Sequence, residues 1–235
     1  MHSRIKVDAE RRSTFQRKLR AWYRRNGREL PWRRSRDPYE VLVSELMLQQ
    51  TQVSRVVTKY AEFLERFPTL ADVARARPRR VMEAWAGLGY YARARNLHRL
   101  AREVTDDGRA PDRMLPAQPD ELARLPGIGA YTAGAVASFA YERRAALVDT
   151  NVARVLRRVF APALDPKSSR GQKQLWGIAE EILPRTGRAA WTHNQAIMEL
   201  GALVCTARVA HCGKCPVKSV CRTGVSVAGA AAKVR

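Results

Sequence analysis

Four cysteines close to the C-terminus form the most specific chemical pattern in the sequence. Cys205, Cys212, Cys215 and Cys221 have the spacing C-x6-C-x2-C-x5-C, and they are all the cysteines of the 235-residue chain. Four thiolates so close in sequence can enclose one metal centre, either a zinc ion or a [4Fe–4S] cluster. The spacing leaves both open, although a six-residue gap is unusual for zinc. We expect a structural role in either case, because the segment has few apolar residues of its own.

Two carboxylates are candidates for acid–base or electrostatic chemistry. Glu45 stands in the apolar run Val-Leu-Val-Ser-Glu-Leu-Met-Leu of residues 41–48. A lone carboxylate there must be paired, for example with an arginine, or lie in a cleft where burial raises its pKa. A raised pKa is what a general acid at neutral pH needs. Asp149 precedes an arginine-rich helix, where an aspartate usually serves as an N-cap, and its functional role needs support from elsewhere.

The segment Leu125-Pro126-Gly127-Ile128-Gly129 joins two expected helices. Gly127 and Gly129 free the backbone N–H groups at the start of the second helix to face a phosphate. A simple helix–helix turn is the alternative. A dinucleotide-binding loop fits poorly, because a third glycine is missing and no strand precedes the segment.

Helical periodicity describes the elements that must position these residues. Asp37-Pro38 can cap and begin the helix that carries Glu45, and Asn26-Gly27 ends an earlier amphipathic helix. We find no convincing alternation typical of a strand, so the expected fold class is all-α. Further helices are expected over residues 53–64, 79–86, 91–105, 119–125, 131–141, 150–160, 169–183 and 191–204.

The charge of the chain favours a polyanionic partner. Lysine and arginine number 43 against 22 acidic residues, which gives a net charge of +21. Each phosphate contact releases condensed counterions, so nucleic acid is the expected partner. We expect no membrane partner, because the apolar runs are too short to span a bilayer. The polar residues 1–12 do not resemble a secretory signal, so we expect a cytoplasmic, nucleoid-associated protein whose reduced cysteines favour metal binding over disulfides.

Several segments taken together resemble the adenine DNA glycosylase (MutY) family of the helix-hairpin-helix glycosylases, over about residues 15–222. The resemblance implies a [4Fe–4S] cluster and two helical lobes with double-stranded DNA between them. It places a barrel lobe at residues 30–150 and a cluster lobe at residues 1–29 plus 151–222, followed by a loose tail at 223–235. The segments that carry it are Leu30-Pro31-Trp32, residues 44–53 (SELMLQQTQV), residues 87–97 (GLGYYARARNL), residues 125–129 with Tyr131-Thr132-Ala133-Gly134, Val148-Asp149 with Asn151-Val152, and the four cysteines.

The resemblance also implies roles for single residues. Glu45 matches the acid that protonates the leaving adenine at N7, and Asp149 matches the carboxylate that stabilises the cationic sugar. Tyr131 and Asn151 match residues that position these two. The residues expected to contact DNA or the lesion opposite the adenine are Gln49, Gln50, Thr51, Leu88, Tyr90, Gly127 and Gly129. The chemistry agrees, because cleavage through an oxocarbenium-like sugar needs one acid for the leaving group and one anion for the sugar.

The sequence departs from the family pattern at three places. Thr150 stands where many members have glycine, and Ala153 stands where some have lysine. The sequence also stops where most members continue into a Nudix-like domain that helps to recognise 8-oxoguanine, so we expect a short form. Short relatives include thymine glycosylases, which share residues like Tyr131 and Asp149.

We therefore expect a monomeric, monofunctional glycosylase that removes adenine mispaired with 8-oxoguanine or guanine from double-stranded DNA. A thymine or uracil glycosylase acting on T:G or U:G mismatches is the alternative enzyme, and a non-catalytic DNA-binding module is the alternative of another class. Bifunctional relatives carry a lysine at the position of Tyr131, and no lysine occurs between Lys59 and Lys167. A Schiff-base step with the sugar therefore lacks its amine in this stretch.

Overall fold

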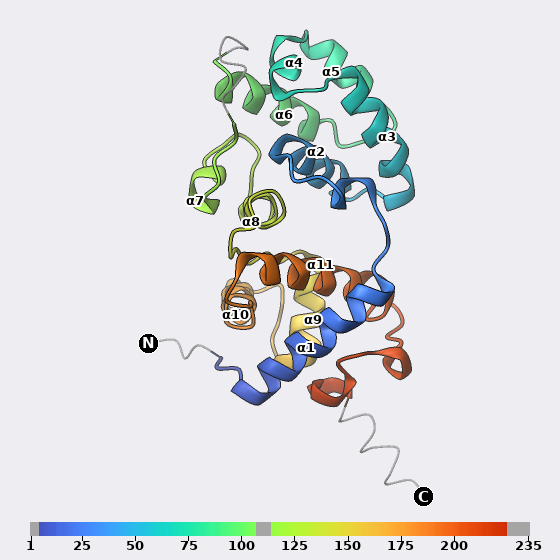
Figure 1. Ribbon diagram of the computed structural model, residues 1–235, viewed down its shortest axis with the longest axis vertical. Helices are drawn as coiled ribbons and strands as arrows, with labels where there is room; N and C mark the ends of the chain where they lie inside the picture. The colour runs from blue at the N-terminus through green and yellow to red at the C-terminus, as the bar shows by residue number, and fades with distance from the viewer. Residues whose placement is uncertain (1–4, 107–113, 225–235) are drawn as a thin grey trace, which may run out of the picture. The chain divides into compact units, whose positions relative to one another are not determined.

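The computed structural model describes residues 5–106 and 114–224. The expected all-α class is confirmed: the described residues form helices joined by turns, and their only bridge of β type is the isolated pair Cys205 and Ala210. The chain divides into two compact units (Figure 1). We call Glu29–Tyr141 the central unit, and Met1–Arg28 with Glu142–Arg235 the terminal unit. No described helix combines the length and the apolar character needed to cross a bilayer.

The central unit is built around the apolar helix α2 (Pro38–Leu48), which packs against α3, α6 and α8. Asp37 caps α2 by accepting hydrogen bonds from the backbone N–H groups of Tyr39 and Glu40, and Pro38 occupies the first helical position, as the sequence predicts. The other elements of the unit are η1 (Pro31–Arg33), α3 (Val53–Arg66), α4 (Leu70–Arg75), α5 (Pro78–Ala84), α6 (Ala92–Val104), α7 (Pro119–Leu122) and α8 (Ala130–Phe139).

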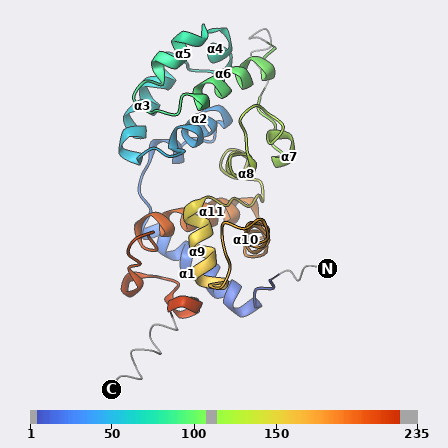
Figure 2. The same ribbon diagram turned by 180° about the vertical axis from the view of Figure 1, so that it is seen from behind.

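The terminal unit joins helices from the two parts of the chain that flank the central unit. Helix α1 (Ala9–Asn26) packs against α11 (Gly187–Leu203), and α9 (Thr150–Phe160) packs against both α11 and α10 (Ser169–Glu181). The reverse view in Figure 2 shows the same four helices gathered together. Phe15 and Leu19 of α1 are fully buried. Two short helical turns, η2 (Cys212–Lys214) and η3 (Lys218–Val220), follow in the cysteine segment.

The boundary between the units differs from the one expected. Residues 142–150, expected at the end of the barrel lobe, belong to the terminal unit. Arg144 explains this, because its guanidinium donates hydrogen bonds to the backbone carbonyls of Glu180 and Pro184, each over 3.0 Å. Asn194 of α11 likewise donates to the carbonyl of Ala145 over 2.9 Å. Of the expected loose tail, residues 225–235 lie outside the described part of the chain.

Candidate active site

The central unit holds a buried carboxyl group paired with a phenol. Glu45 lies in the last turn of α2 and is 3% exposed, among apolar neighbours that are also buried. Tyr131, in the first turn of α8, donates a hydrogen bond from its Oη to Glu45 Oε2 over 2.6 Å. Gln49 at the end of α2 reaches the same helix, where its Nε2 donates to Thr132 Oγ1 over 3.4 Å. Residues distant in sequence are therefore brought together around one buried acid.

Two loops next to the end of α2 line a cavity of about 560 Å³. The first loop follows α2 and contains Gln50 and Thr51, and the second precedes α6 and contains Leu88 and Tyr90. The loops touch, because Thr51 Oγ1 donates to the carbonyl of Leu88 over 3.4 Å. The cavity is lined by Gln50, Thr51, Gln52, Arg55, Gly87, Leu88, Gly89, Tyr90 and Tyr91.

Backbone strain accompanies this cavity. Gln50 and Tyr90 both adopt positive φ angles, of 55° and 46°, which side chains other than glycine rarely do. Strain of this kind concentrates at binding and catalytic sites. Tyr90 is 59% exposed, whereas Leu88 is only 3% exposed. Leu88 lines the cavity although it is buried in this structure, and its contact with DNA stays a prediction.

The hairpin lies between α7 and α8 and depends on its first glycine. Gly127 has a φ of 77°, and a Cβ placed there would lie 2.5 Å from Cβ of Asn96 in α6. A side chain is therefore excluded both by conformation and by space. Gly129 is the N-cap residue of α8, which has no side-chain cap, and nothing lies within 4 Å of a Cβ placed on it. The first amides of α8 can thus face an anion.

The terminal unit contains the other candidate carboxyl group, Asp149. Asp149 is the N-cap of α9, as the simplest interpretation of the sequence held: Oδ1 accepts a hydrogen bond from the backbone N–H of Val152 over 2.6 Å. Its other oxygen accepts from Asn151 Nδ2 over 3.1 Å. Burial raises the pKa of Asp149, and these hydrogen bonds and the charge of Arg154 oppose that rise. A carboxylate held by donors on both oxygens has a fixed orientation.

Two arginines of α9, which sequence reasoning missed, link Asn151 to the cysteine segment. Arg154 donates from Nη2 to Asn151 Oδ1 and from Nε to the carbonyl of Cys205, each over 2.7 Å. Arg158 donates from Nη1 to Cys205 Sγ over 3.3 Å, and its own carbonyl accepts from Cys221 Sγ over 3.4 Å. The four-residue spacing that places both arginines on one helix face was the available signal.

The four cysteines are free thiols on turns of the terminal unit. Burial raises the pKa of Cys215 to about 11; a hydrogen bond from the backbone of Val217 opposes the rise, and the charges of the other three thiols add to it. Burial likewise raises the pKa of Cys221, and Cys205 and Cys212 add to that rise. The thiols are thus close enough to interact electrostatically. Within the described residues, however, no three cysteine, histidine or acidic groups are arranged so that they could hold a metal ion.

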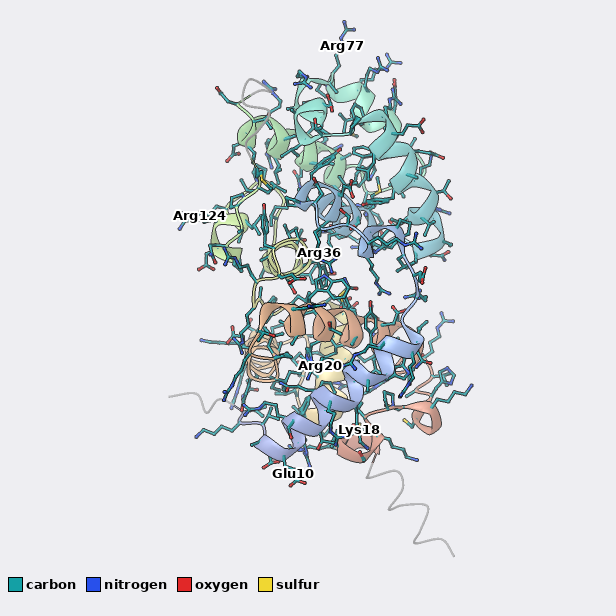
Figure 3. The ribbon with its side chains drawn as sticks, in the orientation of Figure 1. Glu10, Lys18, Arg20, Arg36, Arg77 and Arg124 are labelled. Atoms are coloured by element: carbon teal, nitrogen blue, oxygen red, sulfur yellow. The ribbon has the colours of Figure 1, made fainter. Side chains whose placement is uncertain are left out.

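Positive charge extends over both units. Figure 3 shows Arg77 and Arg124 of the central unit pointing away from the ribbon, and it places Lys18 and Arg20 on α1 of the terminal unit. The 43 lysine and arginine side chains of the sequence are numerous enough to contact several phosphates of a nucleic acid.

The class of protein follows from comparison of this helical architecture with known families. A model of the HhH-GPD superfamily of base excision DNA repair proteins matches residues 43–181, a span that includes the hairpin and both carboxylates. A solved structure described as a thermostable thymine-DNA glycosylase superposes with a TM-score of 0.82 at 28% identity, covering 92% of this chain and 98% of that one.

Closer sequence relatives narrow the class. The adenine DNA glycosylase of Mycolicibacterium smegmatis is 46% identical over 205 residues, which is 87% of this chain and 67% of the relative. The human adenine DNA glycosylase is 44% identical over 219 residues, which is 89% of this chain, but the chain spans only 39% of the human protein's length. The chain belongs to the adenine DNA glycosylase family within the HhH-GPD superfamily.

Proposed function

We propose that the chain is a monofunctional DNA glycosylase that removes adenine mispaired with 8-oxoguanine or guanine. The observation that carries the proposal is the pair of Glu45 and Tyr131 in the apolar centre of the central unit, in a chain similar to adenine DNA glycosylases. A buried carboxyl group held by a phenol has a fixed position and little competition from water, as a general acid requires.

The proposed reaction assigns one task to each carboxyl group. Glu45 gives a proton to N7 of adenine, and the bond between C1′ and N9 then breaks with its electron pair going to the base. Asp149 stabilises the positive charge that remains on the sugar. Water adds to C1′ and loses a proton, which leaves an abasic site. The assignment of both groups to one nucleotide rests on the family and on the chemistry of each group.

The two loops are proposed to hold the DNA open while the base is outside the stack. Extrusion of a base costs a few kcal/mol, and residues that fill the gap reduce that cost. Tyr90 is suited to this because its aromatic ring is exposed, and Gln50 and Thr51 supply amide and hydroxyl groups for the opposite base. The hairpin at Gly127 and Gly129 is proposed to bind a phosphate.

We further propose that the four cysteines hold a [4Fe–4S] cluster. Their sequence spacing supports this, as do the mutual effects on the pKa values of Cys215 and Cys221. The segment also needs an internal support, because Val217 is its one fully buried apolar side chain among the described residues of 206–224. When bound, the cluster would supply a rigid core for this segment, and the thiols would close around it.

A duplex panel tests the proposed function. Duplexes with central A:8-oxoguanine, A:G, T:G and U:G pairs are incubated with the protein and scored for base release. We expect release from A:8-oxoguanine, with A:G slower. Release confined to T:G and U:G would favour the second candidate, a thymine or uracil glycosylase, which the likeness to the solved thymine-DNA glycosylase supports. Binding to all four duplexes without release would favour a non-catalytic module.

We also propose that the protein acts as a monomer in the cytoplasm, bound to the nucleoid. The charge of +21 supports association with DNA. Light scattering of the free protein and microscopy of a fluorescent fusion test these two points.

A further inference from the structure

A single buried arginine lies where the two cavity loops meet. Arg93, in the first turn of α6, is 7% exposed. Within the described part of the chain no carboxylate pairs with it; its hydrogen-bond acceptors are one hydroxyl and backbone carbonyls. Burying a charge without a counter-ion is costly. A shell of acceptors as complete as this one therefore requires an explanation.

One side of the guanidinium holds the end of α2 and the first loop. Nη1 donates to the carbonyls of Leu46, Met47 and Gln49 over 2.6, 2.9 and 2.6 Å. The last carbonyls of a helix have no amide partners within the helix and carry a partial negative charge. A cation that binds them ends α2 at a defined place and fixes the residue just before the strained Gln50.

The other side holds the second loop. Nη2 donates to the carbonyls of Leu88 and Gly89 over 3.1 and 3.0 Å, and to Thr51 Oγ1 over 3.2 Å. Nε lies 3.4 Å from the carbonyl of Tyr90, and the guanidinium carbon lies 5.6 Å from the centre of the Tyr90 ring. One planar group therefore joins both loops through their backbones.

Both strained residues are adjacent to, or among, the groups that Arg93 binds. The carbonyl before Gln50 and the carbonyls of Gly89 and Tyr90 are all acceptors for it. Positive φ angles at Gln50 and Tyr90 cost free energy and persist only where the surroundings impose them. Arg93 binds both the carbonyl that precedes Gln50 and the carbonyl of Tyr90, and it is not among the residues that line the cavity.

We propose that Arg93 is a positioning residue that locks the two loops into one rigid wedge, and thereby controls extrusion of the base rather than cleavage of its bond. The proposal rests on the proposed function. Lysine cannot replace the arginine, because one ammonium has three donors at a single point, whereas the guanidinium presents donors on opposite edges.

The test compares two substrates that differ in the need for extrusion. Single-turnover base release is measured for wild type and Arg93→Lys on a duplex with A:8-oxoguanine, and on a duplex in which the adenine faces an abasic site and has no pairing partner. We expect a loss of about 30-fold or more on the paired adenine and of threefold or less on the unpaired one. An equal loss on both would overturn the proposal, since it would show that Arg93 acts on Glu45 or on folding.

A fluorescent adenine analogue opposite 8-oxoguanine gives a second measurement. Its emission rises when the base leaves the stack, and we expect that rise to be slower or smaller with Arg93→Lys. Arg66→Lys is the matched control, because Arg66 also contacts a ring, Phe67 at 5.8 Å, and pairs with Glu83 at 3.7 Å, away from both loops. Wild-type emission kinetics with Arg93→Lys would contradict the proposal.

A second variant and a further measurement keep the outcome clear. If Arg93→Lys does not fold, Thr51→Val, which removes one acceptor of the guanidinium, takes its place in the hydrogen-exchange measurement, because Thr51 is itself proposed to face the opposite base and its rate of base release would not isolate the effect of Arg93. Hydrogen exchange of residues 49–52 and 87–91 does not depend on activity. Both segments should lose protection together in Arg93→Lys, and loss in one alone would refute the joint lock. A wild-type protein without glycosylase activity would instead refute the proposed function and leave the exchange result standing.

Discussion

Replacement of Glu45 by glutamine tests the acid at the centre of the site. Glutamine has nearly the same shape, and its amide oxygen can accept the hydrogen bond that Tyr131 donates over 2.6 Å. The amide has no acidic proton to give to the leaving base. A positioned general acid contributes about 10²–10⁴-fold to a rate, so the barrier should rise by about 3–5 kcal/mol. The fold should lose about 1–3 kcal/mol at most, the range for one unsatisfied buried polar group.

The assay is single-turnover release of adenine from an A:8-oxoguanine duplex, with alkaline cleavage to reveal abasic sites and fluorescence anisotropy to measure duplex binding. Glu45→Gln should bind within about threefold of wild type, because a buried acid contributes little to phosphate contacts. Glu62→Gln is the control: Glu62 is an exposed acid in a surface ion pair with Lys59 at 2.6 Å, and such pairs contribute little. A folded Glu45→Gln protein that releases adenine at the wild-type rate would refute the assignment.

Four other outcomes follow from the same structure. Asp149→Asn should lose most activity yet keep or raise the melting temperature at pH 7, because asparagine caps α9 equally well. The buried carboxylate of the wild type, whose folded pKa is raised, is destabilising above that pKa, so the difference in melting temperature between variant and wild type should shrink on acidification. A clear loss of stability of the variant at pH 7 would contradict this reasoning. Purified protein should be brown and contain iron, whereas Cys212→Ser should lose iron and solubility; one zinc per chain would contradict the cluster. Affinity for duplex should fall about a thousandfold between about 50 and 200 mM salt if six or so phosphates are contacted, and a flat response would contradict the charge argument. Borohydride should trap no covalent complex, since Tyr131 cannot form an imine; efficient trapping with strand nicking would show an amine at the sugar.

Local sequence patterns predicted much of this molecule. Asp37-Pro38 located the start of α2, and apolar periodicity located α6, α8, α9 and α10 to within a few residues of their observed ends. The sequence analysis missed helix α4, although Thr69 and Asp72 form a capping box, a pattern that predicts the start of a helix. Helix α11 begins before the expected residue 191, because Thr186 caps it through the backbone N–H of Ala189.

Contacts between distant residues were beyond local patterns. The glutamate of the candidate site was identified from its apolar surroundings, but the arginines at 93 and 154 were not, because both bind backbone carbonyls that every residue possesses. The carbonyl of Leu88 belongs to the same network, and the sequence gives no sign of it. Only the folded chain shows which carbonyls converge on one cation.

The separation of α1 from its partners along the chain has a consequence for biosynthesis. The central unit is one uninterrupted stretch, so it can fold on the ribosome as soon as it emerges. Helix α1 precedes the central unit in the sequence, yet its partner α11 ends only at Leu203. At about 5–20 residues per second, the buried faces of Phe15 and Leu19 stay uncovered for about 10–40 s. The four cysteines follow α11 in the sequence, so the nascent chain presents its thiols only after the main helices of both units have been made, and the terminal unit assembles after the central unit can fold.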